Sequence, residues 1–251
     1  MGPAVPTLAV STPASGCRFE TWSLQCRDWS IHSGASQFWI LLHLLGLSLI
    51  NGLSWQAPLN SCTANAICTA WRYAQHFVEP GFIPSRLFVY YNERYVERTT
   101  PLDNGAKISD GCISLLKNGV CSEQTWPYDP EREPILPPRY AYDEARQHVI
   151  HTPAKIDTDN IDFLKYSLLE NKPFVVGIAV FPGMEDENAR FSGRVPMPLP
   201  GQTPIGGHAV LCVGYNDLEQ VWIFRNSWGP TWGVEGWVLA FSLNMLSHLI
   251  E

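Results

Sequence analysis

Apolar side chains recur every three to four residues in the first half of the chain, which is the period expected of helices with one buried face. The spacing predicts a helix over residues 62–77, beginning after the capping-type residue Ser61 and stopping before Pro80 and Gly81. Its buried face would carry six apolar residues: Ala66, Ile67, Ala70, Trp71, Ala74 and Phe77. Cys62 would then lie in the first turn of a buried amphipathic helix.

Two more helices are predicted in this half of the chain. One covers residues 85–98, directly after Pro84, and the other covers residues 109–118 and ends at Gly119, a residue type favoured after a last helical turn. The face of the first that would be buried carries Leu87, Phe88, Tyr91 and Tyr95. The first half is therefore expected to be helical.

The second half has the pattern of strands after one further helix at residues 160–170. Strands are predicted at 174–181, 207–215, 221–227 and 236–241. Asn216 and Asp217 are turn-forming residues, so the second and third of these strands should form a hairpin. The segment between 181 and 206, rich in proline and glycine, is expected to be a surface loop at the rim of a cleft. Helices followed by strands predict an α+β fold with two lobes.

The segment before residue 55 is atypical. Residues 1–37 are rich in Pro, Ser, Thr and Gly without a lasting period, so we expect weak order there. Residues 38–53 form a mostly apolar run near the lower length limit of a membrane span. A buried or interfacial segment, an uncleaved signal anchor and a cleaved signal all remain open. The cleaved signal is the weakest reading, because the run starts late and its nearest upstream basic residue is Arg27.

The composition of the chain excludes several classes of partner. Of 251 residues, 45% are hydrophobic, which is ample for a packed core. The formal net charge of −7 and the lack of any Lys/Arg cluster argue against nucleic acid as a partner. The seven cysteines include no C-x-x-C pair, and no histidine pair has H-E-x-x-H spacing, so no metal site is expected. We expect a soluble monomer, with membrane association only through residues 38–53.

An odd number of cysteines leaves at least one thiol for chemistry. Cys62 is the candidate, because a helix N-terminus favours the thiolate. Nucleophilic catalysis also needs a base and a group that orients it. His208 starts one strand of the predicted hairpin and Asn226 ends the other, 146 and 164 residues after Cys62. The hairpin should bring both side chains to one side of the sheet.

Three other cysteines and one aromatic motif are expected to have structural roles. Cys212 lies on the strand face of His208 and should fill the core. Cys112 and Cys121 flank a short helix, and we expect free thiols there. Trp126 and Tyr128 surround a proline and should form a rigid packed loop.

Four segments carry a resemblance to a known family: QAPLNSCTANA at 56–66, PSRLFVYYNER at 84–94 with ISDGCISLLKNGVCSEQTWPY at 108–128, GGHAVLCVGY at 206–215, and RNSWGPTWGVEGW at 225–237. The chain resembles the papain-like cysteine peptidases, most closely the bacterial and viral branch that lacks the usual inhibitory pro-region. The resemblance covers about residues 55–245. It implies a two-lobed papain-like fold, with the nucleophile at the start of a central helix in a helical lobe, facing a β-barrel-like lobe.

By this resemblance Cys62 is the nucleophile, His208 its base and later acid, and Asn226 the residue that orients the imidazole. Gln56, six residues before Cys62, would form the oxyanion hole together with the backbone N–H of the cysteine. Trp228 would shield the Asn–His hydrogen bond from water.

The implied domain is residues 55–251, with a helical part at about 61–147 and a β-rich part at about 148–245, after the atypical segment 1–54. The implied activity is cysteine-type endopeptidase cleavage of a peptide or protein substrate without a cofactor. Acyl transfer or isopeptide cleavage with the same triad is an alternative, as is a catalytically degenerate binding protein. The chain departs from the family where Ala57 and Asn60 replace glycines and Thr63 replaces a tryptophan.

Overall fold

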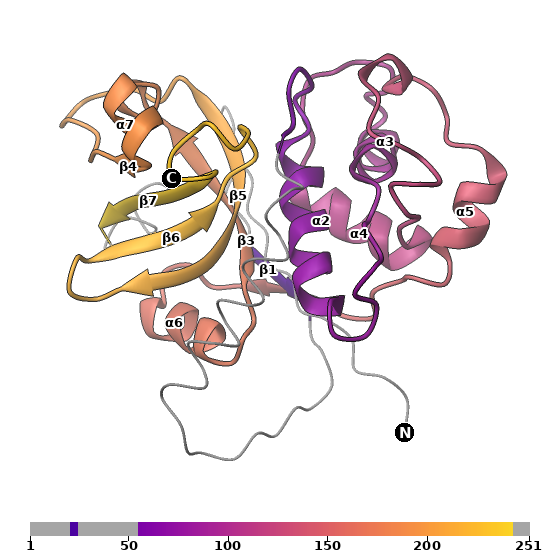
Figure 1. Cartoon of the computed structure of the whole chain (residues 1–251), viewed down its shortest axis with the longest axis horizontal. Helices are drawn as coiled ribbons and strands as arrows, with labels where there is room; N and C mark the ends of the chain where they lie inside the picture. The colour runs from indigo at the N-terminus through magenta and orange to yellow at the C-terminus, as the bar shows by residue number, and fades with distance from the viewer. Residues whose placement is uncertain (1–20, 25–54, 243–251) are drawn as a thin grey trace.

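The computed structural model describes residues 21–24 and 55–242, which form a helical body and a sheet body side by side (Figure 1). The helical body contains α2 (Cys62–Gln75), α3 (Arg86–Glu97), α4 (Ile108–Asn118), the short 3-10 helix η1 (Pro130–Arg132) and α5 (Arg139–Ala145). The sheet body contains β1 (Thr21–Leu24), β2 (Pro153–Ile156), α6 (Ile161–Leu169), β3 (Phe174–Val180), η2 (Pro182–Met184), α7 (Glu187–Ser192), β4 (Arg194–Val195), β5 (Gly206–Asn216), β6 (Val221–Arg225) and β7 (Trp237–Ser242). The α+β class and the two-lobed arrangement predicted from the sequence are confirmed.

The helices begin and end close to the predicted residues because local signals fix them. The hydroxyl of Ser85 accepts a hydrogen bond from the backbone N–H of Phe88 and caps α3. The side chain of Asn160 caps α6 in the same way. Gly119 ends α4 with a φ of 73°, and a Cβ there would lie 1.8 Å from the carbonyl oxygen of Ala145. Only glycine fits this close approach.

The seven strands form one sheet in the order β2-β1-β3-β5-β6-β7-β4. All neighbours are antiparallel except β4, which runs parallel to β7 at one edge. The predicted β5–β6 hairpin is confirmed, with Leu211 opposite Arg225. The lobe expected to be barrel-like is thus, within the described ranges, a curved sheet with β2 and β4 at its edges (Figure 1).

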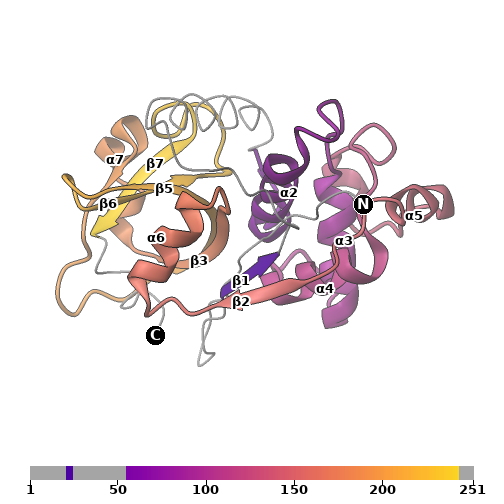
Figure 2. The ribbon, with the colours of Figure 1, turned by 90° about the horizontal axis from the view of Figure 1, so that it is seen from below.

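The period-2 alternation of β5 divides the core in two. Ala209, Leu211 and Val213 join the helices in one buried cluster, whereas Val210 and Cys212 join the cluster on the other face of the sheet. Cys212 is fully buried, as predicted for a core residue. Helix α2 packs against β5, so the interface between the two bodies runs along this helix and this strand (Figure 2).

Several elements differ from the sequence-based expectations. The segment expected to be weakly ordered contains β1, which lies between β2 and β3 in the sheet. Backbone pairing to two neighbours supplies order that the local sequence does not encode. The predicted loop between 181 and 206 holds η2, α7 and β4, and the sequence pattern missed α5 and β2.

The apolar run 38–53 lies outside the described residues. Among the helices that are described, none is long and apolar enough to cross a membrane.

Candidate active site

The β5–β6 hairpin joins His208 to Asn226. His208 Nε2 donates to the side-chain oxygen of Asn226 at 2.7 Å, and both side chains are buried. The amide oxygen can only accept, so the proton of the neutral ring lies on Nε2 and Nδ1 is free to accept one. The structure thus brings together the two residues that the hairpin was expected to join.

An aromatic cover lies over this pair. The ring of Trp228 stacks on His208 with 4.7 Å between centroids, and Trp232 meets Trp228 edge-on at 5.2 Å. Excluding water from a hydrogen bond lowers the local dielectric and strengthens it. The shielding expected of Trp228 therefore agrees with this geometry.

Cys62 is the first residue of α2 and is half-buried against the sheet body. Its thiol is within hydrogen-bonding reach of the backbone of Ala209, the residue after His208. The packing of α2 on β5 therefore brings the thiol beside the strand that carries the imidazole.

The expected preference of Cys62 for the thiolate form is outweighed by burial. Desolvation raises the pKa of the Cys62 thiol to about 11, although the Ala209 backbone acts in the opposite direction. Burial also lowers the pKa of His208 to about 4 against the effect of the Asn226 hydrogen bond. With these pKa values both the thiol and the imidazole are uncharged at pH 7.

Gln56 is held beside the same pair by Ser227, the neighbour of Asn226. Its backbone N–H donates to the Ser227 carbonyl at 2.9 Å, and its side-chain oxygen accepts from the Ser227 hydroxyl at 2.5 Å. The side-chain nitrogen has only a long contact of 3.4 Å, to the carbonyl of Leu59. Fixing the oxygen end fixes the direction of the N–H end. Ser227 was not among the site residues predicted from the sequence, although this serine lies within the motif that contains Asn226.

The two residues that replace glycines before Cys62 do not adopt the left-handed backbone region that favours glycine. Neither Ala57 nor Asn60 has a positive φ. Asn60 instead uses its side chain: its amide donates to the backbone carbonyl of Asp103 at 2.8 Å, while its backbone N–H donates to the Asp103 carboxylate at 3.0 Å. Tyr90 donates to the same carboxylate at 2.5 Å. An asparagine anchored to the helical body thus stands where the family usually has glycine.

Tyr128 closes the segment 56–61 from the other side. Its hydroxyl donates to the carbonyl of Gln56 at 2.6 Å and lies 2.5 Å from the hydroxyl of Ser61. The guanidinium of Arg86 lies over the tyrosine ring, 4.2 Å from its centroid. Ser61 occupies the predicted cap position, but its hydroxyl bonds Tyr128 instead of a helix N–H. The segment that contains Trp126 and Tyr128, expected to form a rigid packed loop, therefore also contacts the candidate site.

A buried carboxyl lies behind the nucleophile. Thr63 donates to Glu93 Oε2 at 2.7 Å, and Glu93 is completely buried. Desolvation raises the pKa of Glu93 well above its usual value. Gly111 makes room for it, because a Cβ there would lie 2.3 Å from Glu93 Oε1. Thr63, where papain-type sequences have tryptophan, thus donates a hydrogen bond to a buried carboxyl group.

The family follows from comparison with known proteins. The model of the family described as papain family cysteine protease matches residues 104–245, more than half of the chain. This chain belongs to the papain family of cysteine proteases. The matched region contains His208 and Asn226 but begins after Cys62, so the geometry of α2 is the evidence that links the thiol to this site.

Individual proteins similar to this papain-family chain are also named as peptidases. An uncharacterized peptidase C1-like protein of Acanthamoeba polyphaga mimivirus is 40% identical over 191 residues, which is 72% of this chain and 61% of the viral protein. Peptidase 1 of Euroglyphus maynei is 28% identical over 59% of this chain and 44% of its own length. The chain therefore spans less than two thirds of these curated relatives.

A solved structure supports the fold. Xylellain, a cysteine protease from Xylella fastidiosa, superimposes with a TM-score of 0.68 at 36% identity, over 80% of this chain and 84% of the xylellain chain. A Carica candamarcensis cysteine protease, solved in complex with E-64, matches with a TM-score of 0.53 at 20% identity and supports the fold alone.

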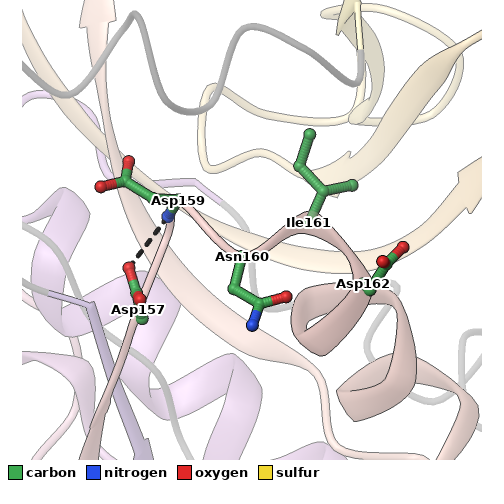
Figure 3. Close-up of a pocket in the computed structure, with 5 residues that line it drawn as sticks. All are labelled: Asp157, Asp159, Asn160, Ile161 and Asp162. Atoms are coloured by element: carbon green, nitrogen blue, oxygen red, sulfur yellow. Dashed lines mark hydrogen bonds between the residues drawn. The ribbon is translucent and has the colours of Figure 1, made fainter.

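A separate pocket lies at the turn from β2 into α6 (Figure 3). It is lined by Asp157, Asp159, Asn160, Ile161 and Asp162. The carboxyl groups of Asp159 and Asp162 point away from each other, and Asp157 accepts the backbone N–H of Asp159 at 3.0 Å (Figure 3). Within the described ranges no three His, Cys, Asp or Glu side chains are grouped to hold a metal ion. The pocket contains none of the residues expected to act in catalysis.

Proposed function

We propose that this protein hydrolyses peptide bonds with Cys62 as nucleophile, His208 as general base and then acid, and Asn226 as the orienting residue. The observation that carries the proposal is the buried His208–Asn226 hydrogen bond of 2.7 Å, next to a cysteine that reaches the backbone of Ala209. A nucleophile, a base within reach and a third group that orients the base are the minimum set for covalent catalysis.

In the first half of the reaction His208 Nδ1 takes the thiol proton while the sulfur of Cys62 bonds to the carbonyl carbon of the substrate. The C=O electrons move onto oxygen. When they return, the C–N bond breaks and the imidazolium gives its proton to the leaving amine. The product is a thioester on Cys62. Water then attacks this carbonyl, His208 takes its proton, and the C–S bond breaks with return of the proton to sulfur.

The oxyanion would be stabilised by the Gln56 side-chain N–H and the backbone N–H of Cys62. Support comes from the Ser227 hydroxyl, which binds the oxygen end of the Gln56 amide at 2.5 Å and leaves the nitrogen end to donate. Tyr128 and Asp103 fix the backbone of the same segment from the helical body. Donors fixed in advance need no reorganisation when the charge develops.

The substrate would be a peptide or protein cleaved within its chain. This assignment rests on the family of the chain, since the mimivirus relative is named as peptidase C1-like and xylellain as a cysteine protease. The steps above balance with water as the only co-reactant, so they need no cofactor.

The experiment is hydrolysis of a set of internally quenched peptides by the purified wild type, Cys62→Ala and Cys112→Ala. Cys112 is buried in the helical body and serves as a matched control. We expect Cys62→Ala to lower kcat/KM by about 10⁴-fold or more, with the control close to wild type. Cleavage limited to lysine side-chain amides would instead favour isopeptidase action. A folded wild type that binds peptides without turnover would contradict the proposal and favour the binding-only alternative.

A further inference from the structure

Trp55 is an exposed indole next to the candidate oxyanion hole. It keeps 63% of its surface accessible, yet its backbone is fixed on two sides. It forms a bridge with Trp228, and its carbonyl accepts a hydrogen bond from Arg86 at 3.3 Å. Its sequence neighbour Gln56 is bonded through the backbone to Ser227. The backbone is thus anchored while the large apolar ring remains available.

The ring lies against Gly229, the residue after Trp228. A Cβ built at Gly229 would lie 3.4 Å from Trp55 Cδ1, which is ordinary contact distance. The φ of +91° at Gly229 favours glycine at this position, beside the indole. The indole of Trp55 thus lies beside Gly229, and the backbone bridge places Trp55 opposite Trp228, whose ring stacks on His208.

The proposed chemistry indicates which part of a bound peptide would pass Trp55. The carbonyl oxygen of the scissile bond is directed to Gln56 and the Cys62 N–H, whereas the leaving nitrogen must meet His208 to receive its proton. The part of the peptide after the scissile bond therefore leaves past His208 and the indole of Trp228 that stacks on it. Trp55 lies beside Trp228 on this path.

We propose that Trp55 is a specificity-determining residue that binds an apolar or aromatic side chain within the first two residues after the scissile bond. The inference rests on the proposed function and deepens it. The guanidinium of Arg86 near the Trp55 backbone forms an ion pair with Glu123 at 3.0 Å, so its positive charge is balanced by a carboxylate. An indole face favours stacked aromatic rings and aliphatic groups.

The test compares two quenched peptides with the same sequence before the scissile bond and either Phe-Phe or Gly-Gly after it. The readout is the ratio of their kcat/KM values in wild type, Trp55→Ala and Trp55→Phe. The ratio does not depend on the fraction of active enzyme. We expect wild type to prefer the Phe-Phe peptide, Trp55→Ala to lower the ratio about 3- to 10-fold through KM, and Trp55→Phe to restore most of it. Tyr140→Ala, which removes an exposed aromatic ring from α5, should leave the ratio as in wild type.

A methyl ester with the same acyl sequence separates the two proposals, since its leaving group has no side chain to bind. If wild type hydrolyses neither the ester nor the peptides, the proposed function fails. If it hydrolyses the ester and both peptides, and Trp55→Ala and Trp55→Phe keep the wild-type ratio, only the role of Trp55 is refuted. If the Trp55→Ala protein does not fold, the test uses Trp55→Phe and Trp55→Leu instead. The Trp55→Phe variant is then expected to keep a higher ratio than the Trp55→Leu variant.

Discussion

Two parts of the candidate active site are built in different ways. The β5–β6 hairpin carries His208 and Asn226 next to each other through backbone pairing that continues into β3 and β7. The segment 56–61, which leads into Cys62, contains no regular strand and is held by side chains from distant parts of the chain. The first part depends on register, and the second on individual hydrogen bonds.

This difference predicts how each part responds to substitution. Removing a side chain from the hairpin deletes a chemical group but leaves the backbone pairing in place. Removing a side chain that holds segment 56–61 leaves the chemical groups present but less well directed, and small displacements reduce catalysis. We therefore expect large, complete losses in the hairpin and graded losses around the segment.

The largest effect is expected for His208→Ala. The variant lacks the proposed general base, so kcat/KM for peptide hydrolysis should fall about 10³- to 10⁴-fold, and circular dichroism should show a folded protein. His148→Ala, which removes a half-buried histidine near Glu79 in the helical body, is the matched control. Equal losses in both variants would show that folding, and not base catalysis, is being measured.

A smaller effect is expected for Gln56→Ala. Loss of one oxyanion donor should lower kcat about 10²- to 10³-fold with little change in KM. Ser227→Ala should lower kcat less, because the Gln56 amide remains but loses the hydroxyl that directs its oxygen. A Ser227→Ala loss equal to that of Gln56→Ala would contradict a purely directing role for the Ser227 hydroxyl.

A graded effect is expected for Tyr128→Phe. The variant keeps the ring under Arg86 but removes the hydroxyl that joins Gln56 to Ser61, so kcat should fall about 3- to 30-fold. Tyr142→Phe removes a hydroxyl that bonds Asn92 in the same body and is the control for general destabilisation. If Tyr128→Phe changes only thermal stability, by as much as the control, the hydroxyl has no role in positioning.

The smallest effect concerns pH. Because burial lowers the pKa of His208 to about 4, the base should stay unprotonated well below pH 6.5, and the rate of Cys62 alkylation should halve only near pH 4. Between pH 6.5 and 4 the unfolded chain takes up a proton at this residue and the folded chain does not, so acidification lowers the free energy of unfolding. His208→Gln should remove this part of the dependence. A rate of Cys62 alkylation that halves near pH 6.5 would contradict the lowered pKa of the buried His208 imidazole.

The contrast also explains what the sequence could reveal. Helix α2, helix α3 and the β5–β6 hairpin follow from local periodicity, caps and turn residues, and His208 meets Asn226 because the hairpin register is local. Tyr128, Ser227 and Asp103 contact segment 56–61 across large sequence separations, and no spacing rule points to them. Strand β1 was missed for the same reason, since its order comes from pairing with β2 and β3.

Burial is a second reason why the structure differs from the predictions made from the sequence. Cys62 lies in the first turn of α2 as predicted, but the direction of its pKa shift depends on how far the thiol is buried. Likewise, Ala57 and Asn60 replace glycines of the family, and the structure shows a negative φ at both residues and hydrogen bonds from the Asn60 side chain.

The most direct test of the central claim is labelling of the wild-type protein with an epoxysuccinyl thiol-protease inactivator, mapped over all seven cysteines by mass spectrometry. The account predicts one label, on Cys62, with labelling lost in His208→Ala and peptide hydrolysis lost in proportion to the label. Labelling of folded protein at another cysteine, or equal labelling of Cys62 in wild type and His208→Ala, would contradict it.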